Sequence, residues 1–271
     1  MLNIKTKILA TALITVLTGC ASSESESDLL KAQLAPSGTL RAAINHSNPL
    51  LGRRDEATGE LSGLAVDLSR ELARRVGLEV ELIPYDSAGK MAADAPNNVW
   101  DIAYLAIDPG RAETIDYSAA HSELEGSYLV PAGSPLQTIE DVDREGVRIA
   151  SAQGAAYDLF LSRELQHAEL VRADSSPAAF DLMVEQQLDA LAGVKASLKL
   201  LTERLPGSRI LDGRFMTIPQ AAGIPKGRPE AARYVREFIE DMKASGFVAE
   251  AFQRHGLGPD DAIVAAPAPI E

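Results

Sequence analysis

Arg111 is the residue of this chain whose type and setting most clearly suggest a chemical role. It follows an apolar run, residues 102–107, and a turn that contains Asp108 and Gly110. A guanidinium is permanently charged, and its rigid fork of N–H donors matches a carboxylate in two parallel hydrogen bonds. The setting therefore indicates that Arg111 holds the carboxylate of a small ligand. Local pairing with an acidic neighbour such as Glu113 is the alternative interpretation.

Two other loops carry polar residues directly after apolar runs. Asn45 and Asn48 follow the run 39–44, where they are candidates for hydrogen bonds to a ligand and equally suitable turn formers. Gln153 opens a glycine turn between the run 147–150 and a helical segment. The first N–H groups of a helix have no partner inside it, so this turn is either an anion site or a plain connection.

The segments around these residues alternate between strand-like and helix-like patterns. Strands are predicted at 39–44, 78–84 and 102–107, and a leucine spacing of four over 64–76 predicts an amphipathic helix. Alternation of this kind implies right-handed crossovers and a largely parallel sheet. Open sheets of this class bind ligands at the carboxyl ends of their strands, where Arg111 falls.

The second half of the chain repeats the alternation. Further strands are predicted at 128–130, 147–150, 168–172, 188–194 and 215–224. Further helices are predicted at 158–167, 176–187, 195–205, 230–245 and 247–255. Residues 258–271 are rich in Ala and Pro and predict a loose tail.

The N-terminus has the pattern of a bacterial export signal. Two lysines precede an apolar run that is too short to span a membrane. The sequence Leu-Thr-Gly-Cys at 17–20 resembles a lipoprotein lipobox, so we expect residues 1–19 to be removed and Cys20 to be acylated, for example with palmitate. Residues 20–36 begin with Ser and Glu and are predicted to form a lipid-anchored flexible tether on the periplasmic side of a membrane.

The charge balance narrows the classes of partner. The formal net charge is −13, and 46% of the residues are hydrophobic. This excess of acid argues against binding to nucleic acid or to anionic lipid surfaces. A single anionic ligand remains compatible, because one arginine can dominate at contact distance. No catalytic triad, zinc motif, phosphate loop or redox cysteine pair is visible in the sequence, so we predict no metal and no cofactor.

The order of elements resembles that of the family 3 extracellular solute-binding proteins, which deliver amino acids and related molecules to ABC importers. The resemblance spans residues 37–257 and is carried by tracts in order: GTLRAAI, TGELSGLAVDLSRELARRVG, WDIAYLAIDPGRAETIDYS, EDVDREGVRIASAQGAAY, VEQQLDALAG and KASGFVAEAFQRHG. It implies the type II periplasmic-binding-protein fold, in which two α/β lobes with mixed, mainly parallel sheets are joined by a two-strand hinge. Lobe 1 would comprise 37–127 plus 224–257, and lobe 2 would comprise 132–219. The hinge would cross near 127–131 and 220–223.

The resemblance also assigns a role to Arg111, as the partner of the ligand's α-carboxylate. Amino-acid binders commonly have Thr where Asp108 stands and Thr or Ser where Ala155 and Ala156 stand. Their usual partner for the ligand's ammonium is missing from 193–195, which reads Gly-Val-Lys. Two explanations follow. Either Asp108 supplies the negative charge for an ammonium group, or the ligand lacks that group and Asp108 orients Arg111.

The same resemblance suggests the rest of the cleft and the function. The other predicted ligand contacts are Asn45, Asn48, Gln153, Tyr157 and Gln220, with Lys90 and Glu125 as weaker candidates, and Tyr157 can instead pack beneath its helix. The resemblance implies a monomer that captures a small carboxylate ligand for an ABC importer permease. A periplasmic enzyme resembling cyclohexadienyl dehydratase is one alternative, since the same fold hosts that activity, and a ligand-sensing lipoprotein is another.

Overall fold

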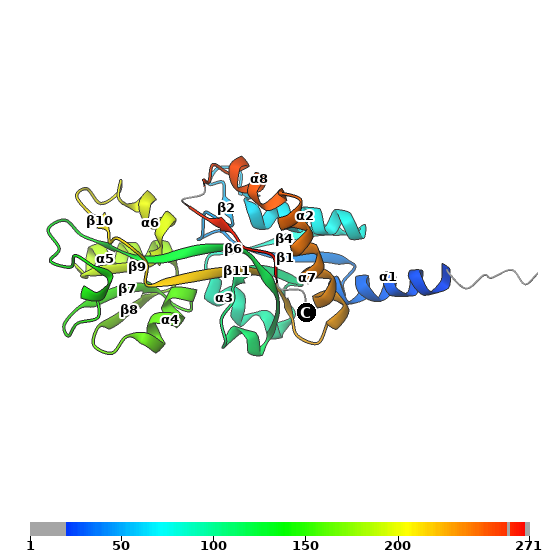
Figure 1. Ribbon diagram of the computed structural model, residues 1–271, viewed down its shortest axis with the longest axis horizontal. Helices are drawn as coiled ribbons and strands as arrows, with labels where there is room; N and C mark the ends of the chain where they lie inside the picture. Colours follow the sequence, from blue (N-terminus) through cyan, green and yellow to red (C-terminus); the bar gives the residue numbers. More distant parts are fainter. Residues whose placement is uncertain (1–19, 259–260, 269–271) are drawn as a thin grey trace, which may run out of the picture.

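Two α/β lobes, joined by two long strands, form the folded part of the chain (Figure 1). The computed structural model describes residues 20–258 and 261–268. The leader predicted at 1–19 lies outside the described residues, and so does the side chain of Cys20, the predicted acylation site. The mixed sheets, with parallel pairing inside each lobe, confirm the predicted fold class.

Lobe 1 is built on three parallel strands in the order β4-β1-β5. Its strands are β1 (Thr39–Asn45), β4 (Glu79–Tyr85), β5 (Ile102–Ala106) and the short hairpin of β2 (Arg53–Arg54) and β3 (Leu61–Ser62). Its helices are α2 (Leu64–Val76), α3 (Ala88–Ala93), α7 (Pro229–Ala244), α8 (Phe247–Arg254) and the 3₁₀ turns η1 (Ala95–Asn97) and η2 (Arg111–Glu113). Helix α2 buries its predicted leucine face, and Gly77 ends it in the left-handed conformation.

Strand β5 is apolar throughout because both of its faces are buried. Ile102 and Tyr104 point into the main core of the lobe, while Ala103 and Leu105 belong to a second cluster around Trp100. The indole of Trp100 donates a hydrogen bond to the carbonyl oxygen of Met91 at 2.9 Å, which ties α3 to this cluster. A strand covered on both faces loses the alternating polar pattern. The turn that follows β5 is therefore held firmly at the edge of the sheet.

Lobe 2 repeats this plan with three parallel strands in the order β9-β7-β8. Its strands are β7 (Arg148–Ala152), β8 (Glu169–Ala173), β9 (Ala190–Val194) and β10 (Arg209–Ile210). Its helices are α4 (Ala156–Glu164), α5 (Ser176–Glu185), α6 (Lys195–Leu201) and the 3₁₀ turn η3 (Ile139–Asp141). Strand β7 pairs in parallel with both β8 and β9. The αβ alternation predicted from the sequence accounts for all three helices that follow these strands.

The hinge consists of β6 (Ile115–Val130) and β11 (Met216–Pro225), which pair with each other in antiparallel fashion. In lobe 1, β11 joins β5 from Gln220 onward, and in lobe 2, β6 joins β9 from Gly126 onward. The strands therefore cross between the lobes at about 121–125 and 216–219, a few residues before the predicted positions. Pairing with β9 begins before the predicted strand 128–130, because β6 is one long strand that starts at Ile115 and its polar residues show no strand pattern in the sequence. Register shifts opposite Ala221 mark bulges in β6, which carries extra residues there at the lobe 1 side of the crossing.

The segment predicted to be a flexible tether contains a helix, α1 (Cys20–Leu34). Its last turn packs on lobe 1, since Leu34 is fully buried. The side-chain carbonyl of Gln33 accepts hydrogen bonds from the backbone N–H groups of Glu230 and Ala231 at the start of α7. The flexible tether was predicted from the Ser and Glu residues of the first half, and the apolar residues of the second half were not recognised as part of a helix. The helix itself projects away from the end of lobe 1 (Figure 1).

The segment predicted to be a loose tail also has a defined place in its described part. Strand β12 (Ile263–Val264) pairs with β6 opposite Glu123 and Ser122. Ala262 and Ala265 on either side are buried. The tail is ordered because it fills the open edge of β6 at the crossing, a partner that local sequence does not reveal.

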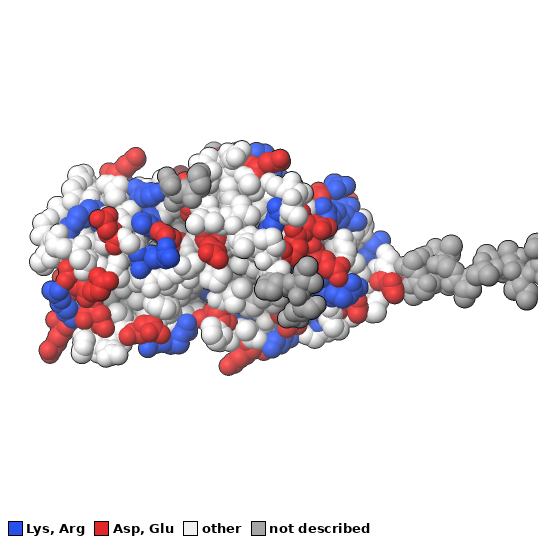
Figure 2. Space-filling view, viewed as in Figure 1, with Lys and Arg blue, Asp and Glu red and all other residues white. Residues whose placement is uncertain are grey.

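The described part of the chain shows how charged and apolar residues are distributed over the surface and the helices. On the face shown in Figure 2, basic and acidic side chains are interspersed over both lobes rather than gathered into a basic stripe. No helix in the described ranges is long and apolar enough to cross a membrane. Nor do His, Cys, Asp and Glu side chains in these ranges form a group of three suited to a metal ion.

Candidate functional site

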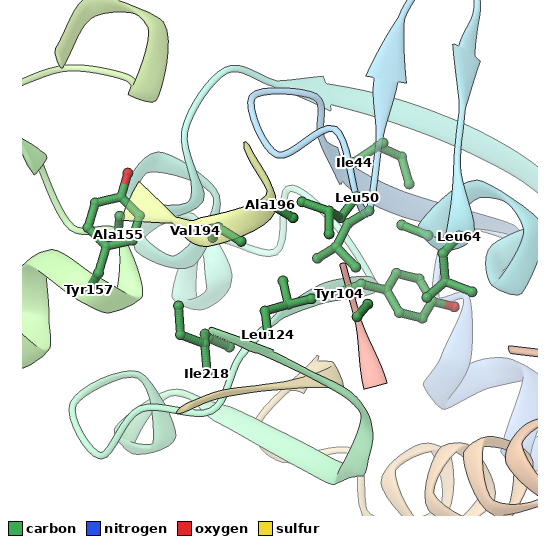
Figure 3. Packing of buried hydrophobic residues seen from close by; sticks show 14 of the residues in the cluster. Ile44, Leu50, Leu64, Tyr104, Leu124, Ala155, Tyr157, Val194, Ala196 and Ile218 are labelled. Carbon is green, nitrogen blue, oxygen red and sulfur yellow. The ribbon is translucent and has the colours of Figure 1, made fainter. Parts of the chain in front are cut away.

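A cavity lies between the lobes, beside the hinge strands. Its polar lining residues are Asn45, Ser47, Asn48, Ser87 and Arg111 from lobe 1, Tyr157, Ser176 and Ser197 from lobe 2, and Gln220 from β11. Apolar side chains form the remaining wall. Figure 3 shows Ala155, Tyr157 and Val194 of lobe 2 on one side and Tyr104 of lobe 1 on the other, with Ile218 of the hinge between them. The predicted cleft thus has walls from both lobes.

Arg111 stands at the wall of this cavity with its side chain almost fully buried. It is 6% exposed and begins η2 directly after the turn that ends β5. One terminal nitrogen donates to the carbonyl oxygen of Ala106 at 3.1 Å, and the other donates across the cleft to the carbonyl oxygen of Gly154 at 2.7 Å. The Nε–H group has no partner among the described residues. Burial lowers the pKa of Arg111, while Tyr117 and Asp108 act in the opposite direction.

A buried cation of this kind is costly unless an anion offsets it. Within the described part of the chain, no carboxylate forms an ion pair with Arg111. A guanidinium with a free N–H group beside a cavity is therefore suited to receiving a carboxylate from a ligand.

Asp108 is buried beside Arg111 but does not line the cavity. One oxygen accepts hydrogen bonds from the backbone N–H groups of Gly110 and Arg111 at 2.9 and 3.3 Å. The other accepts from Arg163 of α4 at 3.0 Å. Both oxygens are thus engaged, one in fixing the turn that presents Arg111 and the other in a bridge to lobe 2. This geometry favours the predicted orienting role of Asp108 over the role of partner for an ammonium group.

Four other predicted residues reach the cavity wall. Asn45 and Asn48 use their side-chain carbonyl oxygens within the loop, accepting from Ser47 and from the backbone of Leu50. Gln220 is 4% exposed and faces the cavity from β11. Tyr157 packs in the core, as the alternative interpretation expected, and its hydroxyl meets Ser176 at 3.0 Å beside the cavity. Burial raises the pKa of Tyr157 to about 12. Their contact with a ligand stays a prediction.

Gln153 does not reach the cavity. Its side chain is exposed and faces a separate shallow hollow that also includes Lys90. The neighbouring Gly154 turns the chain with φ +71° and gives its carbonyl oxygen to Arg111. The backbone N–H of Gly154, part of the predicted anion site, donates instead to the carboxylate of Asp158 on α4. A carboxylate of α4 itself therefore occupies the predicted anion site, and this backbone N–H group is not free to bind an external anion.

The two weaker candidates also lie outside the cavity. Lys90 pairs with Asp86 at 3.1 Å on the exposed side of α3. Glu125 accepts from Lys195 and Arg214 at 3.1 and 2.7 Å near the hinge crossing. Conversely, the sequence did not point to Ser197 on α6, which lines the cavity and whose buried hydroxyl has no partner among the described residues. Nothing in the sequence of α6 distinguishes this serine from a surface serine.

The lobes touch at the rim of the cavity. A Cβ atom on Gly89 of α3 would lie 2.7 Å from the carbonyl oxygen of Gln153 and 3.1 Å from the Cα of Gly154. Together with the bonds from Arg111 and Arg163, this approach shows the lobes in a closed arrangement around the cavity. Closure that encloses a ligand is the function for which such a two-lobed fold is suited.

Comparison with known proteins agrees with this geometry. Residues 40–258 match the model of the bacterial extracellular solute-binding proteins, family 3. The chain belongs to this family. A similar relative is the ABC transporter glutamine-binding protein of Bacillus subtilis, which is 22% identical over 241 residues that cover 87% of each chain.

Solved structures of solute-binding proteins share the fold. The solute receptor for L-cysteine of Neisseria gonorrhoeae superimposes with a TM-score of 0.76 at 19% identity, covering 88% of this chain and 99% of the receptor. An ancestral amino acid-binding protein, described as a precursor of cyclohexadienyl dehydratase, superimposes with a TM-score of 0.70 at 20% identity. That match covers 85% of this chain and 98% of the other.

Proposed function

We propose that this solute-binding protein captures a small carboxylate ligand, an amino acid or a related organic acid, between its lobes and delivers it to the permease of an ABC importer. The observation that carries the proposal is the buried guanidinium of Arg111 at an interlobe cavity, with no carboxylate bonded to it among the described residues. The relatives named for amino-acid binding support the ligand class. Gln220, Asn45, Asn48 and Tyr157 are the further ligand contacts.

We also propose that the protein acts as a lipid-anchored monomer on the periplasmic side of a bacterial membrane. The support is the lipobox ending at Cys20 and the family match. Helix α1 begins at Cys20 and projects from the end of lobe 1, away from lobe 2 (Figure 1). An anchor at that point leaves the rim of the cavity free.

Binding is favoured over dehydratase chemistry by the composition of the cavity wall. Dehydration needs a general acid close to the leaving group. No carboxyl or imidazole group belongs to the lining in the described ranges, and Glu125 and Asp108 are paired elsewhere. Turnover of prephenate or arogenate by the purified protein would overturn the binding proposal.

The test is thermal unfolding of the purified protein against a panel of amino acids and carboxylic acids. A true ligand at about 100 times its dissociation constant should stabilise the protein by about 2.7 kcal/mol. Arg111→Ala should abolish that shift, and Arg111→Lys should weaken binding about tenfold or more, because an ammonium lacks the planar fork.

The matched control is Arg236→Ala, which removes an exposed arginine on α7. This variant should keep the full shift. Circular dichroism establishes that each variant is folded. Retention of every ligand shift in folded Arg111→Ala, or the absence of any shift in the unmodified protein, contradicts the proposal.

A further inference from the structure

The cavity wall carries a single formal charge. Arg111 is the one lining residue in the described ranges that is charged at neutral pH. The other polar groups are hydroxyls and amides, such as those of Asn45, Ser197 and Gln220. Apolar residues, including Leu191 and Ile218, complete the wall. The described wall therefore has one positively charged group, several neutral polar groups and an apolar remainder, and it has no acidic residue.

Three carboxylates near this wall already have cationic partners. Asp108 is paired with Arg163, and Asp158 accepts from Arg172 and from the N–H of Gly154, each at 2.9 Å. Glu125 is bound by two cations at the hinge. An amino-acid zwitterion would therefore bring an ammonium group into a cavity beside a buried guanidinium, with no carboxylate in the described lining to offset its lost hydration.

We infer that the ligand is a monocarboxylate with an uncharged body, one that carries no ammonium group. This inference rests on the proposed function. Of the two ligand types, with and without an ammonium group, it selects the one without. The carboxylate neutralises Arg111, and the apolar wall covers the body. Asn45 lines the cavity, and because its carbonyl oxygen accepts from Ser47, its amide N–H groups remain to donate to a neutral oxygen such as a keto or hydroxyl group. The unpartnered hydroxyl of Ser197 offers a second contact. Acids of the 2-oxo and 2-hydroxy classes fit this description.

Isothermal titration with matched pairs tests the inference directly. Each pair has the same carbon skeleton and differs at C2: pyruvate and L-alanine, 4-methyl-2-oxopentanoate and L-leucine, phenylpyruvate and L-phenylalanine. We expect the 2-oxo acid of the best-binding pair to bind at least about tenfold more tightly than its amino acid, because burying an ammonium group without a carboxylate partner is costly.

Gln220→Glu is the reciprocal test. It adds one carboxylate to the cavity wall with almost no change in shape, so it should weaken the 2-oxo acid and reduce or reverse the preference over the amino acid. Gln253→Glu adds the same charge on the exposed surface of α8 and should leave the preference unchanged.

The outcomes separate the inference from the proposed function. If the amino acid binds as tightly as its 2-oxo partner and Arg111→Ala abolishes both, the inference is wrong and the carboxylate function stands. If neither series binds, or binding survives Arg111→Ala, the proposed function fails and the inference fails with it. A preference for the 2-oxo acid that Gln220→Glu reduces and Gln253→Glu preserves supports both.

Discussion

At the scale of single residues, burial has different consequences for two basic side chains, Arg111 and His121. Arg111 is a buried cation that has no anionic partner among the described residues, and this makes it suited to binding an anionic ligand. His121 on β6 is fully buried with its Nδ1 bonded to Ser122, and its Nε2 has no partner in the described part of the chain. Burial, reinforced by the positive charge of Lys243, lowers its pKa to about 3. This histidine is therefore neutral in the folded protein.

His121 makes a testable contribution to the pH dependence of stability. An unfolded histidine titrates near pH 6.5, so between about pH 6.5 and pH 3 the unfolded chain binds a proton that the folded protein does not. The free energy of unfolding should therefore fall as the pH falls through this window, by up to about 1.4 kcal/mol per unit from this residue. Urea unfolding at pH 4 to 7 measures the slope.

The variant His121→Gln should lose that part of the slope, whatever its effect on stability at pH 7. The exposed His167 provides the control, since His167→Gln should keep the slope of the unmodified protein. Equal slopes in all three proteins would mean that His121 is not the group responsible.

At the scale of elements, the closest approach of the lobes joins α3 to the glycine turn before α4. Gly89→Ala would place a methyl group against backbone atoms of Gln153 and Gly154, which cannot rotate away as a side chain can. The variant should hold the lobes apart and weaken ligand binding about tenfold without altering any residue of the cavity wall. Titration calorimetry gives the affinity, and small-angle scattering in saturating ligand should give a larger radius of gyration.

The control for this change is Gly258→Ala. Among the described residues, a Cβ there would meet only the flexible carboxylate of Asp261, at 3.9 Å. It should leave both affinity and radius unchanged. Unaltered closure in Gly89→Ala would show that the lobes do not need this contact to enclose the ligand.

At the scale of the whole molecule, the net charge of −13 opposes the approach of an anion, while Arg111 attracts it only at close range. Raising the ionic strength from 10 to 150 mM shortens the screening length from about 30 Å to about 8 Å. The association rate of a monocarboxylate should therefore rise a few-fold, measured by stopped-flow fluorescence. A zwitterionic ligand, with no net charge, should show a nearly constant rate. A rate that falls with salt would mean that the local field of Arg111 governs the approach.

The order of most elements and the position of Arg111 directly after β5 could be predicted from the sequence alone. The spacing of apolar residues in α2, α7 and the strands depends on local geometry, so it is readable without the fold. Arg111 follows β5 directly in the chain, and the end of a strand in this class of sheet is a ligand position. The order of the tracts was likewise enough to indicate two lobes and a hinge.

The directions of the side chains and the pairing of the charges could not be predicted from the sequence, because they depend on contacts between residues that are distant in the chain. Asp108 meets Arg163, 55 residues away, and this contact removed it from the cavity. Gln153 turned outward while Ser197 turned inward, and neither direction follows from the local pattern. The order in α1 and β12 also comes from partners distant in the chain. The described cavity wall has no acidic residue, and this too depends on the tertiary structure, because contacts between distant residues decide which carboxylates are paired with cations.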